Sequence, residues 1–324
     1  MKILVTGGTG YIGSITVREL QKKGHEVVVV DNVISGNKES ISCELIVGDL
    51  SDKDFLKNNV KGEFDAVIHF AAYALPGESM ENPYKYFYNN LVGGLNLLEF
   101  MRERKVSRII FSSTCAIYGY PEKLPVVEDA SKHPESVYGE SKLQFENVLH
   151  WYDVIYGIKS ICLRYFNAAG GSLDGQLGEH HKPESHIIPI AINSVINNSE
   201  FHLYGNDYET EDGTCIRDYV HIEDLAIAHI QALDYLIKNT SSNVFNIGFG
   251  RGYSNLEVIR MIEKVSGKKL NVAISSRRAG DPAIIYGDVS KAKNILGFEA
   301  KYSDLETIIK TAWDWHSKHS VENE

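Results

Sequence analysis

Short apolar runs alternate with stretches of helical period through the first half of the chain. Runs of this length, rich in Val, Ile and Phe and bounded by glycine or polar residues, are typical of buried parallel strands. We expect strands at Lys2–Thr6, Glu26–Asp31, Cys43–Val47, Asp65–Ala72 and Arg108–Thr114, and helices at about Ile12–Lys23 and Pro83–Lys105. The alternation predicts an α/β fold with a Rossmann-like, doubly wound parallel sheet covered by helices.

A glycine-rich turn with Gly7, Gly10 and Gly13 connects the first expected strand to the first expected helix. Glycines let a pyrophosphate approach backbone N–H groups, and the helix aims its N-terminus at that charge. Asp31 ends the second expected strand, at the spacing where dinucleotide-binding folds place an acid against the adenosine ribose. Because an acid there repels a 2′-phosphate, the pattern predicts NAD as the cofactor rather than NADP.

Three hydroxyl residues, Ser112, Ser113 and Thr114, end the fifth expected strand. Ligands of parallel sheets bind beyond the carboxyl ends of the strands, although hydroxyls at strand ends are commonly turn formers or helix caps. Tyr138 and Lys142 follow at a spacing of four, which places both on one face of a helix. This spacing also occurs on solvated helix faces. Because the pair occurs in a chain with this cofactor signature, we interpret it as catalytic. The Lys142 ammonium would favour the phenolate form of Tyr138 and so make Tyr138 a base.

Composition and charge narrow the classes of function. The chain has 324 residues, of which 43% are hydrophobic, so it can bury one large core or two moderate ones. A net charge of −10 without a basic cluster argues against nucleic acid and anionic membranes as partners. No apolar run is long enough to span a bilayer, and the strand at the start leaves no room for a signal peptide. The dispersed cysteines are expected to be reduced, in a cytoplasmic protein: Cys43, Cys115, Cys162 and Cys215.

After Asn167 the strand–helix rhythm weakens, and Gly170–Ser185 is rich in glycine, histidine and acidic residues. We therefore expect an NAD-binding Rossmann domain at residues 1–168 and a smaller α/β substrate-binding domain at 169–324, of which some segments rejoin the first domain. His180 and His181 have no third ligand at a suitable spacing, so no metal site is expected. His69, inside an apolar run, is expected to be a core residue rather than a catalytic one.

Three longer segments resemble the UDP-glucose (UDP-galactose) 4-epimerases of the extended short-chain dehydrogenase/reductase family. They are Phe111–Gly119, Leu163–Asn167 and Tyr204–His221, and they accompany the glycine turn and the Tyr138/Lys142 pair. The resemblance extends from Met1 to about Trp315. The block Asn206–Thr214 is far more specific to these epimerases than the Tyr/Lys pair is.

The resemblance implies reversible, NAD-dependent C4 epimerisation of UDP-glucose and UDP-galactose through a 4-keto intermediate, in galactose metabolism. Tyr138 is then the base that takes the proton of the sugar 4-hydroxyl and later returns it, so its pKa is expected near the working pH. Lys142 hydrogen-bonds the nicotinamide ribose and lowers that pKa, and Thr114 relays the proton. NAD is expected to stay tightly bound and to be regenerated in each turnover.

The resemblance also implies the binding residues. For the cofactor these are Gly7, Gly10, Tyr11, Ile12, Gly13, Asp31, Asn32, Asp49, Leu50, Phe70, Ala71, Ala72, Asn89, Ser112, Tyr138, Lys142 and Tyr165. For the UDP-hexose they are Thr114, Tyr138, Phe166, Asn167, His186, Ile187, Ile188, Tyr204, Arg217, Arg278 and Asp281. Tyr204 is expected against the uracil, Arg217 and Arg278 against the diphosphate, and Asp281 against the uridine ribose. Many relatives have Asn where His186 stands.

Particular positions in the sequence favour or disfavour other activities. Ile285 stands where the family carries a residue that limits room for an N-acetyl group, so a UDP-N-acetylhexosamine or dual-specificity epimerase stays open. A 4,6-dehydratase or a decarboxylase is disfavoured because Cys115 and Ala116 replace the acids that follow the strand-end threonine. A non-catalytic dinucleotide sensor would lose the Tyr/Lys pair. Relatives form homodimers through the helices near Pro83–Lys105 and Val137–Tyr156, so a homodimer is expected.

Overall fold

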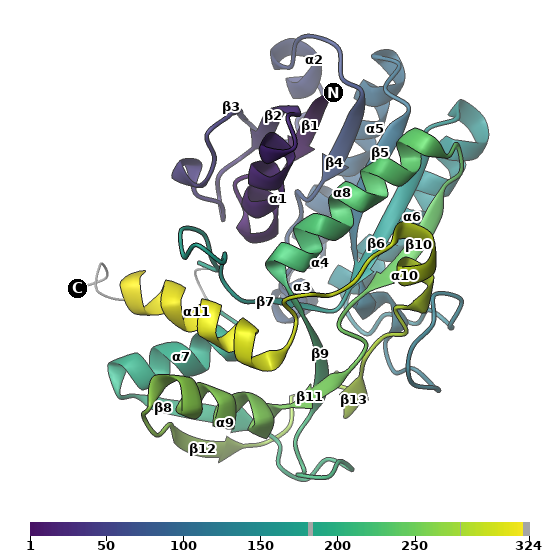
Figure 1. Ribbon diagram of the computed structural model, residues 1–324. Helices are drawn as coiled ribbons and strands as arrows, with labels where there is room; N and C mark the ends of the chain where they lie inside the picture. Colours follow the sequence, from purple (N-terminus) through teal and green to yellow (C-terminus); the bar gives the residue numbers. More distant parts are fainter. Residues whose placement is uncertain (181–183, 279, 320–324) are drawn as a thin grey trace.

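A computed structural model describes residues 1–180, 184–278 and 280–319. Its largest element is a seven-stranded parallel sheet of order β10-β6-β5-β4-β1-β2-β3 (Figure 1). The strands are β1 (Lys2–Thr6), β2 (Glu26–Asp31), β3 (Glu44–Val47), β4 (Ala66–His69), β5 (Arg108–Thr114), β6 (Lys159–Tyr165) and β10 (Asn243–Ile247). The strand order reverses between β1 and β4, and such a switch point opens a ligand crevice at the carboxyl ends of the strands. The predicted doubly wound fold is confirmed.

Helices cover both faces of this sheet because successive strand residues point to opposite sides. On one face, Ile3 and Val5 pack with α1 (Tyr11–Lys22), α8 (Ile222–Lys238) and α10 (Ser290–Leu296). On the other face, Leu4 packs with the remaining large helices of this layer, α2 (Phe55–Asn59), α5 (Gly93–Glu103) and α6 (Val137–Tyr156). Each face therefore has its own apolar core.

A smaller unit lies beyond the carboxyl edge of the sheet (Figure 1). Its core is formed by α7 (Ile187–Asn197), α9 (Asn255–Ser266) and α11 (Leu305–His319), with the parallel pair β8 (Glu200–Tyr204) and β12 (Asn271–Ser275). A second small sheet contains β7 (Asn167–Ala169), β9 (Ile216–His221), β11 (Gly252–Ser254) and β13 (Ile284–Ile285). The chain returns to the large sheet through α8 and β10. The division at residues 168 and 169 stays a prediction.

Two elements differ from their predicted bounds by more than one residue. The helix expected at Pro83–Lys105 consists of α4 (Pro83–Phe87), a π-helical turn η2 (Tyr88–Val92) and α5, and a short helix α3 (Pro76–Glu81) precedes it. The strand expected to reach Ala72 ends at His69, because the next two backbone N–H groups, of Phe70 and Ala71, both donate to the carbonyl of Thr6. Two short 3-10 helices complete the fold, η1 (Lys38–Ser40) and η3 (Cys115–Tyr118).

Several expectations about single residues can be compared with the structure. His69 is buried, its Nδ1 lies 2.6 Å from Thr6 Oγ1, and burial lowers its pKa to about 3, as fits a core residue. The four cysteines are free of disulfide bonds. Across the described ranges, no helix combines the length and apolar character that a bilayer crossing needs.

Candidate active site

The glycine turn is built so tightly that side chains would not fit. Gly7 has φ +74°, and a Cβ added to it would lie 2.4 Å from the backbone nitrogen of Ala71. A Cβ on Gly13 would lie 2.2 Å from the carbonyl oxygen of Gly7. Gly10 caps α1 without a side-chain hydrogen bond, and the first turn of α1 carries no acid. The N–H groups at the N-terminus of α1 suit a pyrophosphate.

Two carboxylates lie beside this turn, at the ends of β2 and β3. Asp31 accepts hydrogen bonds from the backbone N–H groups of Thr9 (3.0 Å) and Val33 (2.8 Å), which fix its orientation. Asp49 accepts from the Asn32 amide at 3.1 Å and from the Ser51 N–H at 2.8 Å. Burial raises the pKa of Asp49, but these hydrogen bonds outweigh that effect, so its pKa is below the ordinary value. This arrangement can accept hydrogen bonds from an adenosine.

The segment after β4 lies against the π-helical turn through a buried amide. Asn90 Oδ1 accepts from the backbone N–H of Tyr73 at 2.9 Å, and its Nδ2 donates to the Tyr73 carbonyl and to Ser141 Oγ. Asn89, the predicted cofactor residue, is only half-buried and donates to Asn90 Oδ1 at 2.9 Å. Asn90 thus joins the turn to helix α6, a role that the sequence signalled only as two adjacent asparagines.

The end of β5 holds the pair on α6. Lys142 Nζ donates to the carbonyl oxygen of Ser112 at 2.8 Å, and the Ser112 hydroxyl is hydrogen-bonded to that of Tyr165. The Thr114 side chain lies near enough to Tyr138 to lower its pKa. Lys142 Nζ lies 6.0 Å from the centroid of the Tyr138 ring. The structure therefore brings the predicted catalytic residues together at the carboxyl edge of the sheet.

Burial moves the pKa values of this pair apart. It raises the pKa of Tyr138 well above that of a free phenol, and Tyr165 adds to the rise while Thr114 opposes it. Burial lowers the pKa of Lys142 to about 7, because a buried ammonium is disfavoured. The protein's own groups therefore do not lower the pKa of Tyr138 to neutral pH. The predicted value near working pH requires a further positive charge beside the phenol.

Residues predicted to bind the nucleotide sugar come together from distant segments. Arg217 on β9 lies 3.3 Å from Asp281, and the Arg278 guanidinium lies 4.0 Å from the centroid of the Tyr204 ring. Asn167 donates to the Asp218 carbonyl at 2.9 Å. Phe166 and Ile188 are buried. Ala279, between Arg278 and Asp281 in the sequence, lies outside the described residues.

Ile285 links this unit to the catalytic edge. It pairs with Arg217 in the small sheet and packs in one apolar cluster with Phe166, Ile117 and Cys115. Cys115 directly follows Thr114, so the two groups of predicted site residues face a common region.

His186, at the N-terminus of α7, is held by two acids. Its Nδ1 lies 2.5 Å from Glu179 Oε1 and 3.4 Å from Glu184 Oε1. Burial opposes the charge, but the two carboxylates outweigh it and raise the pKa of His186 to about 10. These three groups have the ligand types and the spacing of a possible metal site, but a metal would have to displace the imidazole proton. His180 is exposed, and His181 lies outside the described residues.

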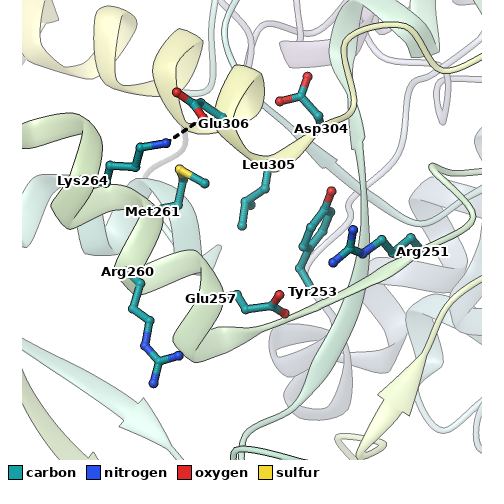
Figure 2. A pocket seen from close by; sticks show the side chains of 9 residues that line it. All are labelled: Arg251, Tyr253, Glu257, Arg260, Met261, Lys264, Asp304, Leu305 and Glu306. Carbon is teal, nitrogen blue, oxygen red and sulfur yellow. Dashed lines mark hydrogen bonds and ion pairs between the residues drawn. The ribbon is translucent and has the colours of Figure 1, made fainter.

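A pocket of about 440 Å³ lies on the smaller unit (Figure 2). Tyr253 and Leu305 point into it, and Lys264 pairs with Glu306 at 2.8 Å on its rim. It contains none of the predicted site residues. This pocket is therefore not the candidate active site.

Comparisons with known proteins agree with this geometry. Residues 3–248 match the family described as "NAD dependent epimerase/dehydratase family". A UDP-glucose 4-epimerase of Lacticaseibacillus casei is 46% identical over 323 residues, which cover 98% of each chain. The crystal structure of UDP-glucose 4-epimerase from Bifidobacterium longum in complex with NAD+ and UDP is 36% identical, with a TM-score of 0.92 and 99% of each chain covered. The UDP-Glc/GlcNAc 4-epimerase of Campylobacter jejuni is 41% identical, with a TM-score of 0.84 and coverage of 98% of this chain and 99% of that one.

Proposed function

Because the chain belongs to the NAD dependent epimerase/dehydratase family, among its UDP-glucose 4-epimerases, we propose that it interconverts UDP-glucose and UDP-galactose by epimerisation at C4. The observation that carries this proposal is the placement of Tyr138, Lys142 and Thr114 at the carboxyl edge of the sheet. The glycine turn fits a dinucleotide pyrophosphate, and the C. jejuni and B. longum enzymes share the fold over nearly their whole length. A role in galactose metabolism is consistent with this activity.

The side chains have distinct tasks in this proposal. Tyr138 takes the proton of the sugar 4-hydroxyl and later returns it, and Thr114 holds the oxygen and relays the proton. Lys142 donates a hydrogen bond to the nicotinamide ribose, and Asp31 binds the adenosine ribose. NAD, held by the glycine turn, Asp31 and Lys142, would supply reversible hydride acceptance at C4 and a positive charge that would lower the pKa of Tyr138.

UDP is proposed to be the part of the substrate that is held firmly, so that the hexose can turn over in the site. Arg217 and Arg278 offer guanidinium groups to the diphosphate. Tyr204 offers a ring to the uracil and Asp281 a carboxylate to the ribose. Asn167, His186 and the first turn of α7 complete the contacts of the sugar and phosphates. The bond that Asp281 makes to Arg217 supports this arrangement, because it orients both groups.

The first test is activity of the purified protein on UDP-glucose and UDP-galactose without added NAD. We expect interconversion until the two sugars reach equilibrium, measured by separation of the nucleotide sugars. A dinucleotide sensor would bind NAD and leave both sugars unchanged, and that result would exclude the proposal.

Activity on N-acetylated sugars is a second candidate function, favoured by Ile285. This side chain is smaller than the aromatic residue that excludes N-acetyl groups, and it is buried beside Phe166. We expect slow turnover of UDP-N-acetylglucosamine, and loss of roughly tenfold or more of that turnover in Ile285→Tyr, as bulk in the pocket costs about 1–3 kcal/mol. Turnover of UDP-glucose serves as the control and should change much less.

We further propose that the protein is a homodimer in the cytoplasm. Large apolar side chains are exposed on both helices: Tyr84 on α4 is 73% exposed, and Trp151 and Ile155, one turn apart on α6, are 59% and 62% exposed. Exposed apolar groups of this kind are typical of an interface between proteins.

The dimer is tested by charge substitution on α6. Ile155→Lys is expected to give a monomer at micromolar concentration, because an ammonium would be buried without a partner. Ile274→Lys is the matched control, since Ile274 is 60% exposed on β12, outside the proposed interface. Light scattering of the unmodified protein at the mass of one chain would rule out the dimer.

A further inference from the structure

We infer that Glu146 is a positioning residue for the catalytic pair, which holds α6 against β5 and supports the charge of Lys142, with Arg164 as its partner. This inference rests on the proposed function. The sequence had pointed only to Tyr138 and Lys142. Glu146 continues the same helix face by another four residues, so the three side chains form one stripe along α6.

Successive residues of β5 each hold one member of this stripe. Thr114 lies beside Tyr138 and lowers its pKa, and the Ser112 carbonyl accepts from Lys142. Ser113, between them, donates its hydroxyl to Glu146 Oε1 at 2.5 Å. A shift of α6 along β5 would break all three contacts together, so Glu146 fixes the register in which the catalytic pair meets the strand.

Arg164 on β6 holds Glu146 in a forked pair. Its Nε donates to Oε1 at 3.0 Å and one terminal nitrogen donates to Oε2 at 2.5 Å, with both side chains buried. The other terminal nitrogen donates to the Tyr118 hydroxyl and to the carbonyl oxygen of Glu128. Every member of this cluster has a partner, as a buried charged group requires.

The charge of Glu146 also acts on Lys142. Burial lowers the pKa of Lys142, and Glu146 is the group that opposes this effect. Removing its charge therefore lowers the pKa of Lys142 further, and the ammonium is lost at a lower pH. Besides Glu146, the titratable groups near Lys142 and Tyr138 are His69 on β4, Tyr86 on α4, Cys115 on η3 and Tyr165 on β6. Around Glu146 they are Arg164, Cys162, Tyr118 and Lys132.

The experiment compares Glu146→Gln with Arg164→Met. Both break the forked pair, but only the first removes the negative charge near Lys142. For each variant, the affinity for NAD is measured by calorimetry after the bound NAD has been removed, and kcat is measured with UDP-galactose on the protein that carries its NAD, both as functions of pH. In Glu146→Gln we expect the alkaline decline of both curves to move to lower pH by roughly one unit. In Arg164→Met we expect no such move, or a move to higher pH.

A purely structural role for Glu146 predicts the same change in both variants, and that result would overturn the inference. If a single variant fails to fold, the double variant Glu146→Gln/Arg164→Met replaces it, because it leaves no unpaired buried charge. It should keep the shift to lower pH, and a curve equal to that of the unmodified protein would also overturn the inference. The pH dependence of NAD affinity distinguishes failure of this inference from failure of the proposed function, because the shift can be present in a protein that lacks epimerase activity.

Discussion

Replacement of Tyr138 by phenylalanine is expected to remove nearly all turnover while the protein still binds NAD and UDP-sugar. The ring keeps its place at the site, and the hydroxyl whose pKa Thr114 lowers is lost. A positioned acid–base group contributes about 10²–10⁴-fold to a rate, so we expect a loss of that size in kcat. The assay follows UDP-galactose conversion, and calorimetry measures the binding of UDP.

The matched control is Tyr156→Phe, since Tyr156 is an exposed tyrosine at the other end of the same helix. It should keep its activity. Turnover in Tyr138→Phe within a few-fold of the unmodified protein would show that another group moves the proton. A loss of NAD together with the activity would instead show that the substitution disturbed the cofactor pocket.

Replacement of Gly13 by alanine is expected to release the cofactor and to destabilise the fold. The added Cβ would lie 2.2 Å from the carbonyl oxygen of Gly7 and 2.9 Å from the Cα of Gly8. Both contacts are with backbone, so no side chain can rotate away, and the N-terminus of α1 must move away from β1. Overpacking of this kind costs about 1–3 kcal/mol, and the displaced turn no longer presents its N–H groups to a pyrophosphate.

Thermal unfolding and the NAD content of the purified protein measure these two effects. Gly77→Ala provides the control because the added Cβ has no neighbouring atom within 4 Å and the residue lies in the first turn of α3. Its unfolding temperature should change little. An unfolding temperature and NAD content in Gly13→Ala equal to those of the control would contradict the close packing of α1 on the turn.

The residues within and next to each element were sufficient to predict the first strands and helix of the cofactor-binding half of the fold. The strand before Gly7, the helix that ends before Gly24 and the strand that ends at Asp31 were predicted nearly to the residue. The bounds of each of these elements depend on residues close by in the sequence, through the period of the apolar residues, the conformation of glycine and the strand propensity of the side chains. Gly24 has φ +80°, which explains why the helix stops there.

Contacts between segments that are distant in the sequence could not be predicted from the sequence. The resemblance named Arg217, Asp281, Arg278 and Tyr204, but their pairing depends on how β9 and the segment after β12 meet in space. The π-helical turn at Tyr88–Val92 was also missed, since it adds one residue to a helical turn without a distinct composition. The cofactor role of Asn89 stays a prediction; the structure adds that the neighbouring amide of Asn90 is buried and joins the π-helical turn to α6.

The pKa of Tyr138 illustrates a third limit. The spacing to Lys142 suggested a lowered pKa, but the effect of burial depends on what surrounds both groups, and in the structure it is the larger one. Spacing alone cannot supply this quantity. It also cannot show that Glu146, on the same helix face, opposes the loss of charge from Lys142.

The late return of the chain to the large sheet has a consequence for biosynthesis. When the residues up to about 168 have left the ribosome, β6 is complete but has neither β10, which pairs with β6, nor α8, which covers its apolar face. The backbone groups along β6 then form an open edge, which is a template for association between chains. The nascent cofactor half is therefore exposed to aggregation until about residue 247 has left the ribosome.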